Sequence, residues 1–223
     1  MCVVSILVSV NCSICGIRKA RRACPIKGEI CSTCCGTERE QTIDCPLDCE
    51  FLRLAHEHEQ KPQHPQEDLP NRDIKIDEDF LRQYEWVFVV AGSALIDAYL
   101  ELPAATDYDA AEALAALVQT YRTLESGLVY ESKPQNPYAA GMYEAFHERI
   151  LDVQKRLTES GESGYLNDSQ VLKLIVFMHR LSVLDNNGRK YSRAFLDMLN
   201  RSYAAKPKPE ETLAEPEEPR IIL

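Results

Sequence analysis

Residues 12–49, CSICGIRKARRACPIKGEICSTCCGTEREQTIDCPLDC, hold eight of the nine cysteines in this chain of 223 residues. Cys-x2-Cys pairs place two thiolates on one tetrahedral Zn²⁺ ion, and eight such ligands complete two four-cysteine sites. The sequence therefore predicts a zinc-binding module over residues 11–59. Its two structural zinc ions would be held by Cys12, Cys15, Cys24, Cys31, Cys34, Cys35, Cys45 and Cys49.

The spacing leaves two ways to divide these ligands. We favour one site made of Cys31, Cys34, Cys45 and Cys49, which leaves Cys12, Cys15, Cys24 and Cys35 for the other. The alternative joins Cys12, Cys15, Cys31 and Cys34, and leaves Cys24, Cys35, Cys45 and Cys49. In both arrangements the adjacent Cys34 and Cys35 serve different metals, so the two sites interlock.

A helix is expected after the last cysteines, because Leu47, Phe51, Leu54 and Ala55 recur at helical spacing within residues 46–58. Cys45 and Cys49 would lie at its start, where the positive end of the helix dipole favours thiolates. This is a treble-clef-like, cross-braced layout. His56 and His58 follow on the same helix, and with eight thiolates present we interpret both as exposed residues.

Composition favours an ordinary soluble, cytoplasmic protein. The formal net charge is −10 and the pI is near 5.1, which argues against broad binding to nucleic acid or to an anionic membrane. Residues 1–10 are apolar but lack a basic start and a small-residue cleavage site, so they do not resemble a signal peptide. Because a cytoplasmic protein keeps its thiols reduced, we expect free cysteines and no disulfides.

Beyond the module, the sequence predicts a mainly α protein whose residues 77–204 form an all-helical bundle. Five amphipathic segments are expected as helices, at residues 77–102, 107–131, 137–159, 167–185 and 192–204. Asp107 and Asp168 are the expected N-caps of two of them. The apolar run from Trp86 to Leu100 is too short to span a membrane, so we expect it at the centre of the bundle.

Two segments lack the pattern of a folded element. Residues 60–76 combine prolines with polar residues and have no periodicity, which is typical of a linker. Residues 205–223 are rich in proline and glutamate, and they predict a disordered tail.

Three strings carry a resemblance to a known group: Cys24–Leu52, Thr120–Glu131 and Asn186–Leu199. They resemble sequences in a group of uncharacterised bacterial proteins that pair a cysteine-rich module with an all-helical domain. The cysteine module also loosely resembles the cross-braced B-box, MYND and HIT fingers, although those use histidine ligands and other spacings. The resemblance implies the architecture and a bacterial cytoplasm, and it implies no reaction.

A basic run, Arg18, Lys19, Arg21 and Arg22, lies between Cys15 and Cys24. Such a loop could contact nucleic-acid phosphates, but no aromatic residue is interleaved to stack on bases. We favour a solvated loop. A third possibility is a polar pocket in the helical domain formed by Asp97, Arg122, His147 and His179, near the turn Asn186–Arg189.

No motif of an established catalytic type is present in the sequence. Four thiolates around zinc leave no open position for a reacting water, so we expect structural zinc and no catalysis. The favoured hypothesis is a zinc-stabilised adaptor that binds an unidentified protein partner, with self-association through the bundle also possible. The alternative is a nucleic-acid-binding regulator that uses Arg18–Arg22.

Overall fold

A computed structural model describes residues 10–59, 69–160 and 166–204. Residues 10–59, here called the cysteine module, contain a short antiparallel hairpin of β1 (Arg22–Cys24) and β2 (Gly28–Ile30). Gly28 begins β2 with a φ of 71°, a conformation that glycine adopts without strain. Two helices follow, α1 (Ser32–Glu38) and α2 (Glu50–His58), and both begin directly after a cysteine.

The remaining described residues, 69–160 and 166–204, form the helical domain. Its helices are α3 (Glu78–Gln83), α4 (Glu85–Glu101), α5 (Asp107–Glu125), α6 (Pro137–Ser160), α7 (Asp168–Asp185) and α8 (Ala194–Ala204). α5 packs against α6 and α7, while α4 packs against α6 and α8. The prediction of a mainly α protein is confirmed.

Two of the expected helices have different limits. The segment 77–102 is divided at Tyr84, whose ψ of 17° separates α3 from α4. The helix expected over 107–131 ends at Glu125, because Gly127 takes a left-handed φ of 79° and turns the chain back. Residues 128–136 then run without regular secondary structure to the start of α6.

The two expected N-caps are each displaced by one residue. Thr106 caps α5 in a capping box with Asp109, and Asn167 caps α7 in a capping box with Gln170. Asp107 is instead fully buried and accepts hydrogen bonds from the backbone N–H groups of Phe195 and Leu196 at the start of α8. Burial raises its pKa to about 6, although these bonds and the Ser192 hydroxyl oppose the shift.

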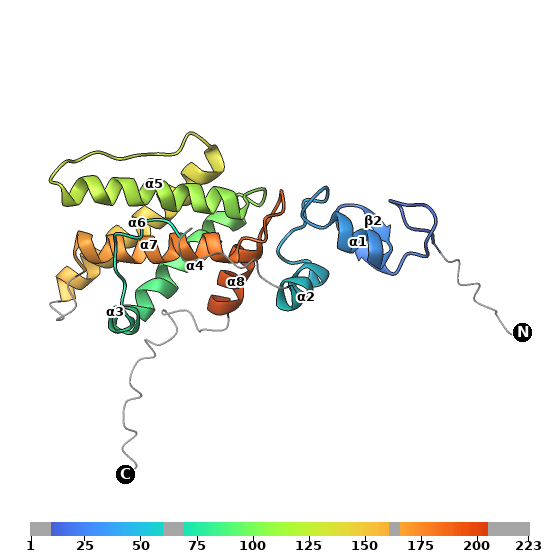
Figure 1. Ribbon diagram of the computed structural model, residues 1–223, viewed down its shortest axis with the longest axis horizontal. Helices are drawn as coiled ribbons and strands as arrows, with labels where there is room; N and C mark the ends of the chain where they lie inside the picture. The colour runs from blue at the N-terminus through green and yellow to red at the C-terminus, as the bar shows by residue number, and fades with distance from the viewer. Residues whose placement is uncertain (1–9, 60–68, 161–165, 205–223) are drawn as a thin grey trace, which may run out of the picture.

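The cysteine module lies at one end of the helical domain, with α2 beside α8 and the hairpin and α1 farther out (Figure 1). Each part has its own hydrophobic cluster. Leu47 of the module belongs to the cluster of the helical domain, and its backbone N–H donates to the hydroxyl of Tyr99 on α4. The two clusters are therefore joined through residues that precede α2.

Residues 69–76 are the described part of the segment expected to be a linker. The Arg180 guanidinium on α7 donates to the backbone oxygens of Pro70, Asn71 and Ile74. Arg122 on α5 forms an ion pair with Asp73. This stretch is thus held against the helical domain, whereas residues 60–68 and the expected tail at 205–223 lie outside the described residues.

Among the residues that the structure describes, no helix combines the length and the hydrophobicity that crossing a membrane requires.

Candidate functional site

Four cysteines converge at the outer end of the cysteine module. The Sγ atoms of Cys12, Cys15, Cys31 and Cys34 all lie within 4.8 Å of one another, and three of the four residues are buried. The described cysteines are all free thiols, with no disulfide among them. A tetrahedral Zn²⁺ ion with Zn–S bonds of about 2.3 Å separates its sulfur ligands by about 3.8 Å. The donor set and its spacing therefore fit a zinc ion.

Hairpin and helix geometry bring these thiols together. The backbone N–H of Ser13 donates to the oxygen of Glu29, which places the first cysteine pair beside the end of β2. Cys31 then caps α1, and its sulfur accepts a hydrogen bond from the backbone N–H of Cys34. The second cysteine pair is thus presented by the first turn of a helix.

The pKa values of these thiols diverge because they lie so close together. Burial raises the pKa of Cys12, but the backbone N–H groups of Cys15, Cys31 and Ile14 outweigh it and lower the value to about 6. Burial and the neighbouring thiols raise the pKa of Cys34 to about 12. Placing four thiolates here requires a compensating positive charge, which a bound dication would supply.

This grouping is the first set of the alternative division proposed from the sequence. It differs from the favoured division, which joined Cys31 and Cys34 to Cys45 and Cys49. The sequence spacing did not reveal that the β1–β2 hairpin returns the chain to Cys12. That return depends on backbone pairing across the module, with Arg22 opposite Ile30 and Cys24 opposite Gly28.

Of the other four cysteines, Cys35 and Cys45 belong to the hydrophobic cluster of the module, and Cys24 and Cys49 pack against it. Burial raises the pKa of Cys45 to about 11, and the nearby Cys49 and Cys24 contribute to the increase. The Arg22 guanidinium donates to the sulfur of Cys35 over 3.1 Å. These four thiols share one region of the module, but they are not grouped as closely as the first set.

A second feature, the junction network, joins the module to the helical domain. It consists of Glu40, His56, Asn187, Arg193 and Asp197. Arg193 is 1% exposed, and its guanidinium contacts Asp44 and the backbone oxygens of Cys45, Pro103 and Ala105. One buried arginine thus joins the loop before α2 to the α4–α5 connection.

His56 lies at the centre of the junction network. Its Nε2 is 3.1 Å from Oε2 of Glu40, and its Nδ1 is 3.0 Å from Oδ2 of Asp197. Burial lowers the pKa of His56, but hydrogen bonds and charges from Asp197 and Glu40 outweigh it and raise the pKa to about 9. The interpretation of His56 as an exposed helix residue was therefore wrong, whereas His58 is exposed as expected.

Glu40 accepts the remaining hydrogen bonds of the junction network. Its carboxylate accepts from the backbone N–H of Arg193 and from the side chain of Asn187, and its backbone oxygen accepts from the N–H of Tyr191. Glu40 has a positive φ of 54°, an uncommon conformation for a residue with a side chain. The four hydrogen-bond contacts that hold it compensate for this backbone strain.

Glu40, His56 and Glu59 are also close enough for one ligand atom of each to reach a common metal ion. Both nitrogens of His56 already face carboxylates, and Glu59 pairs with Arg189 at 3.0 Å. A metal would have to displace these partners. The group is better explained as an ionic connection between the module and the helical domain.

The basic run does not present all its charges outward. Arg18 has its pKa raised, first by a side-chain hydrogen bond to Cys31 and then by the charge of Cys15. The guanidinium of Arg22 lies 4.7 Å from the ring centre of Phe51. Lys19 and Arg21 are the exposed members of the run that have no such contact within the described chain.

The polar residues suggested as a pocket in the helical domain have separate partners. Asp97 pairs with Arg149 at 3.1 Å, and His147 packs against the rings of Tyr121 and Tyr143. Arg122 and His179 both contact Asn71. These contacts explain the polar groups as ion pairs, hydrogen bonds and ring contacts between elements of the helical domain.

Sequence patterns alone would not have identified Glu40, Arg193 and Asp197, because they belong to no spacing motif. The one available signal nearby was the polar turn Asn186–Arg189, which follows α7 and was interpreted as an ordinary turn. The structure shows that this turn contacts the module through Arg189, whose guanidinium donates to the backbone oxygen of Arg39.

The chain matches no protein-family model, no curated protein and no solved structure.

Proposed function

We propose that this protein is a zinc-stabilised recognition protein that binds a protein partner and does not catalyse a reaction. The observation that carries the proposal is the way the cysteine module is attached. Buried Arg193 and the His56 ion pairs hold the end of the module firmly on α8, while the four-cysteine cluster lies at its outer end. Such an attachment lets the module and the helical domain form one rigid surface, which suits the binding of a partner.

The chemistry of the cysteine cluster supports a structural role for its metal. Four thiolates saturate the tetrahedral coordination of Zn²⁺ and leave no position for substrate or water. A module of about fifty residues has too small a core to fold firmly alone, so bound metal would supply part of its stability. Cytoplasmic location and a bacterial source stay predictions from the sequence.

The proposal includes a second zinc ion, held by Cys24, Cys35, Cys45 and Cys49. These residues cluster in one region, and Cys45 and Cys49 flank the loop that leads into α2. Metal analysis of the full chain should then give two zinc equivalents. Cys31→Ser and Cys45→Ser should each lose about one equivalent, and the double variant should lose both.

A result of one equivalent in the unaltered chain would remove the second site from the proposal. If the double variant retained one equivalent, Cys31 and Cys45 would share a site, as in the division first favoured from the sequence. Ser5→Ala is a suitable control for zinc lost during purification, because Ser5 lies before the cysteine module in the sequence.

The recognition function is tested by partner capture with the zinc-loaded full chain. The unaltered protein should retain a specific partner at physiological salt, and chelation should release it because the module loses its shape. If no partner is enriched over a chelated control, the recognition function is rejected.

Nucleic-acid binding through Arg18, Lys19, Arg21 and Arg22 is the second candidate. It is less favoured because Arg18 and Arg22 interact with cysteines and with Phe51, which leaves Lys19 and Arg21 as the exposed charges without such a contact in a chain of net charge −10. A salt-dependent shift of a labelled oligonucleotide that is lost in Arg21→Glu would favour it.

A further inference from the structure

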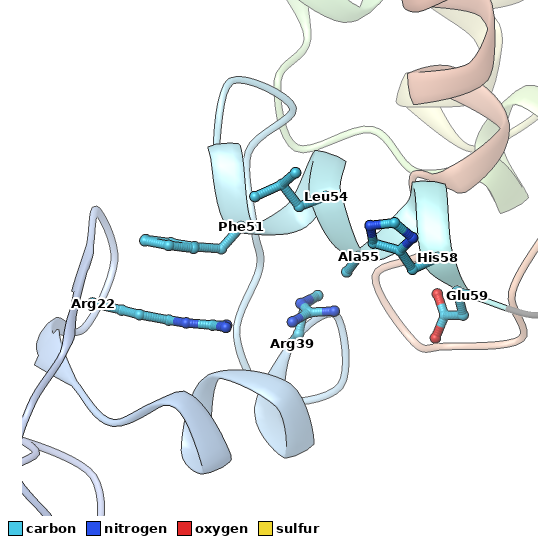
Figure 2. A pocket seen from close by; sticks show the side chains of 7 residues that line it. All are labelled: Arg22, Arg39, Phe51, Leu54, Ala55, His58 and Glu59. Carbon is cyan, nitrogen blue, oxygen red and sulfur yellow. The ribbon is translucent and has the colours of Figure 1, made fainter.

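A solvent-open groove of about 400 Å³ lies between the hairpin side of the cysteine module and helix α2. Figure 2 shows Arg22 and Arg39 entering it from one side, opposite Phe51, Leu54 and Ala55 of α2. Its volume is in the range of about 300–1,000 Å³ that is typical of ligand pockets. None of the four clustered cysteines lines the groove, which adjoins the junction network through Glu59, an acceptor for the side chain of Asn187.

Arg39 is the first reason to expect a ligand in this groove. Its Nε is buried and has no hydrogen-bond partner in the described part of the chain. No carboxylate within the described ranges forms an ion pair with Arg39 or Arg22. A buried donor on a charged group is unfavourable without an acceptor, so an oxygen ligand that reached the Arg39 guanidinium from the groove would stabilise it.

Arg22 supplies a second, fixed guanidinium. It lies 4.7 Å from the ring centre of Phe51, and its Nη1 donates to Cys35 Sγ. In Figure 2 its guanidinium end is directed toward Arg39. These contacts hold the group in place before any ligand arrives, which lowers the entropy cost of binding.

The opposite side of the groove is apolar. Leu54 is 51% exposed although it lies on a helix that packs on the domain, and Ala55 lies beside it. His58 extends this wall and adds a possible hydrogen-bond donor. Glu59 closes one end of the groove, where its carboxylate is paired with Arg189. Away from that end the groove combines a cationic side with an apolar side, which suits an anion attached to a hydrocarbon group.

We infer that this groove binds an acidic peptide segment of the partner protein, with one carboxylate or phosphate on Arg22 and Arg39 and a neighbouring apolar side chain on Leu54. The inference rests on the proposed recognition function and specifies the chemistry of the partner. Guanidinium groups bind both oxyanions through paired hydrogen bonds. Because the two arginines and Leu54 lie on opposite sides of the groove, they fix the orientation of the bound segment.

A peptide fits the groove better than a nucleic acid. Arg22 covers one face of the Phe51 ring, which removes it as a free platform for base stacking. The net charge of −10 opposes the long-range attraction on which binding to a polyanion depends. A short peptide with a few charges is affected much less by this repulsion.

The test uses the zinc-loaded, ¹⁵N-labelled full chain and follows the side-chain Nε–H resonance of Arg39. Phenyl phosphate and phenylacetate serve as anionic probes with an apolar body, and benzyl alcohol is the neutral control. Both anions should shift this resonance saturably, and the alcohol should not. If neither anion produces a saturable shift, or if the alcohol binds as well, the groove is not an oxyanion site.

Matched variants locate the binding through other resonances of the groove. Arg39→Gln should weaken the binding of phenyl phosphate by about tenfold or more, whereas Arg21→Gln removes the same charge from an exposed position and should leave it unchanged. Leu54→Glu places a negative charge beside the two arginines, where it repels the anionic probe, and should cause a similar loss. Equal losses in Arg21→Gln and Arg39→Gln would indicate general charge attraction and overturn the site.

A competition experiment identifies the kind of ligand. A fluorescein-labelled peptide containing Glu-Glu-Leu should be displaced by phenyl phosphate and should bind the Arg39→Gln chain weakly. A labelled single-stranded oligonucleotide should not compete at physiological salt. If the oligonucleotide displaces the probe and the peptide does not bind, the groove is a nucleic-acid contact and the inference is wrong.

These results are separable from the recognition function itself. If the peptide binds in the groove but no partner is captured, the recognition function is rejected while the groove remains an anion site. If a partner is captured equally well by the Arg39→Gln chain, the recognition function stands and the groove is not its contact.

Discussion

The Nδ1 atom of His56 lies 3.0 Å from Oδ2 of Asp197, across 141 residues of sequence. His56 belongs to α2 of the cysteine module and Asp197 to α8 of the helical domain. Because both side chains are almost fully buried and Glu40 occupies the other imidazole nitrogen, the three groups form an ionic contact between the two parts of the protein. Its strength depends on the proton carried by His56.

The first prediction is that the protein loses stability at alkaline pH because His56 loses its proton there. Its pKa is about 9 in the folded chain and near 6.5 in the unfolded chain, so its stabilising contribution is complete below about pH 6.5. The contribution falls as the pH rises through about 9, and the full loss is about 3 kcal/mol. Urea unfolding at about pH 6 and about pH 10 measures it.

The matched variants are His56→Gln and His58→Gln. The first should be less stable at about pH 6 and should lose most of this pH dependence, whereas the second changes an exposed histidine on the same helix and should behave like the unaltered chain. An unchanged pH profile in His56→Gln would show that the dependence arises from another group.

The second prediction concerns Arg193. Replacing it with methionine keeps much of the side-chain volume but leaves the backbone oxygens of Cys45, Pro103 and Ala105 without this donor. We expect a loss of about 3–5 kcal/mol in the free energy of unfolding, measured by urea denaturation. Arg156→Met removes an exposed i,i+4 pair and should cost less than about 1 kcal/mol. Equal effects would contradict a special role for Arg193.

The third prediction concerns metal removal. A chelator should disorder the cysteine module while most of the helical circular dichroism signal remains, because the helical domain has its own core. The helical domain should nevertheless unfold at a lower urea concentration, since Glu40, Asp44 and His56 would no longer hold Arg193 and Asp197. An unchanged midpoint after verified loss of zinc would show that the junction network survives without metal.

The fourth prediction concerns residues 69–76. Trypsin should cleave slowly after Arg72 and Lys75, because Arg180 and Arg122 hold this segment against the helical domain. Arg180→Ala removes three hydrogen bonds to its backbone and should accelerate cleavage there about tenfold or more. Mass spectrometry of early fragments identifies the cut positions, and Arg156→Ala serves as the control. Rapid cleavage of the unaltered chain would contradict the observed anchoring.

Sequence periodicity predicted the helices well, except where a single backbone angle ended or divided one. Within the helix expected at residues 137–159, the apolar residues Met142, Phe146 and Ile150 recur at a spacing of four, and all three are fully buried on α6. The break at Tyr84 and the turn at Gly127 depend on how the following segments pack. The residues adjacent in the sequence carry little information about such packing.

The cysteine spacing by itself indicated that Cys12, Cys15, Cys31 and Cys34 can hold a metal ion, because Cys-x2-Cys pairs have only a few geometries that bring both sulfurs together. It also determined that the chain divides into a cysteine-rich part and a helical part. Only the tertiary structure decided that Cys12 and Cys15 meet Cys31 and Cys34, and that Glu40, His56, Arg193 and Asp197 join the two parts. Such contacts connect residues far apart in the chain, and their partners are selected by packing and by the need to pair buried charges, which no local spacing records.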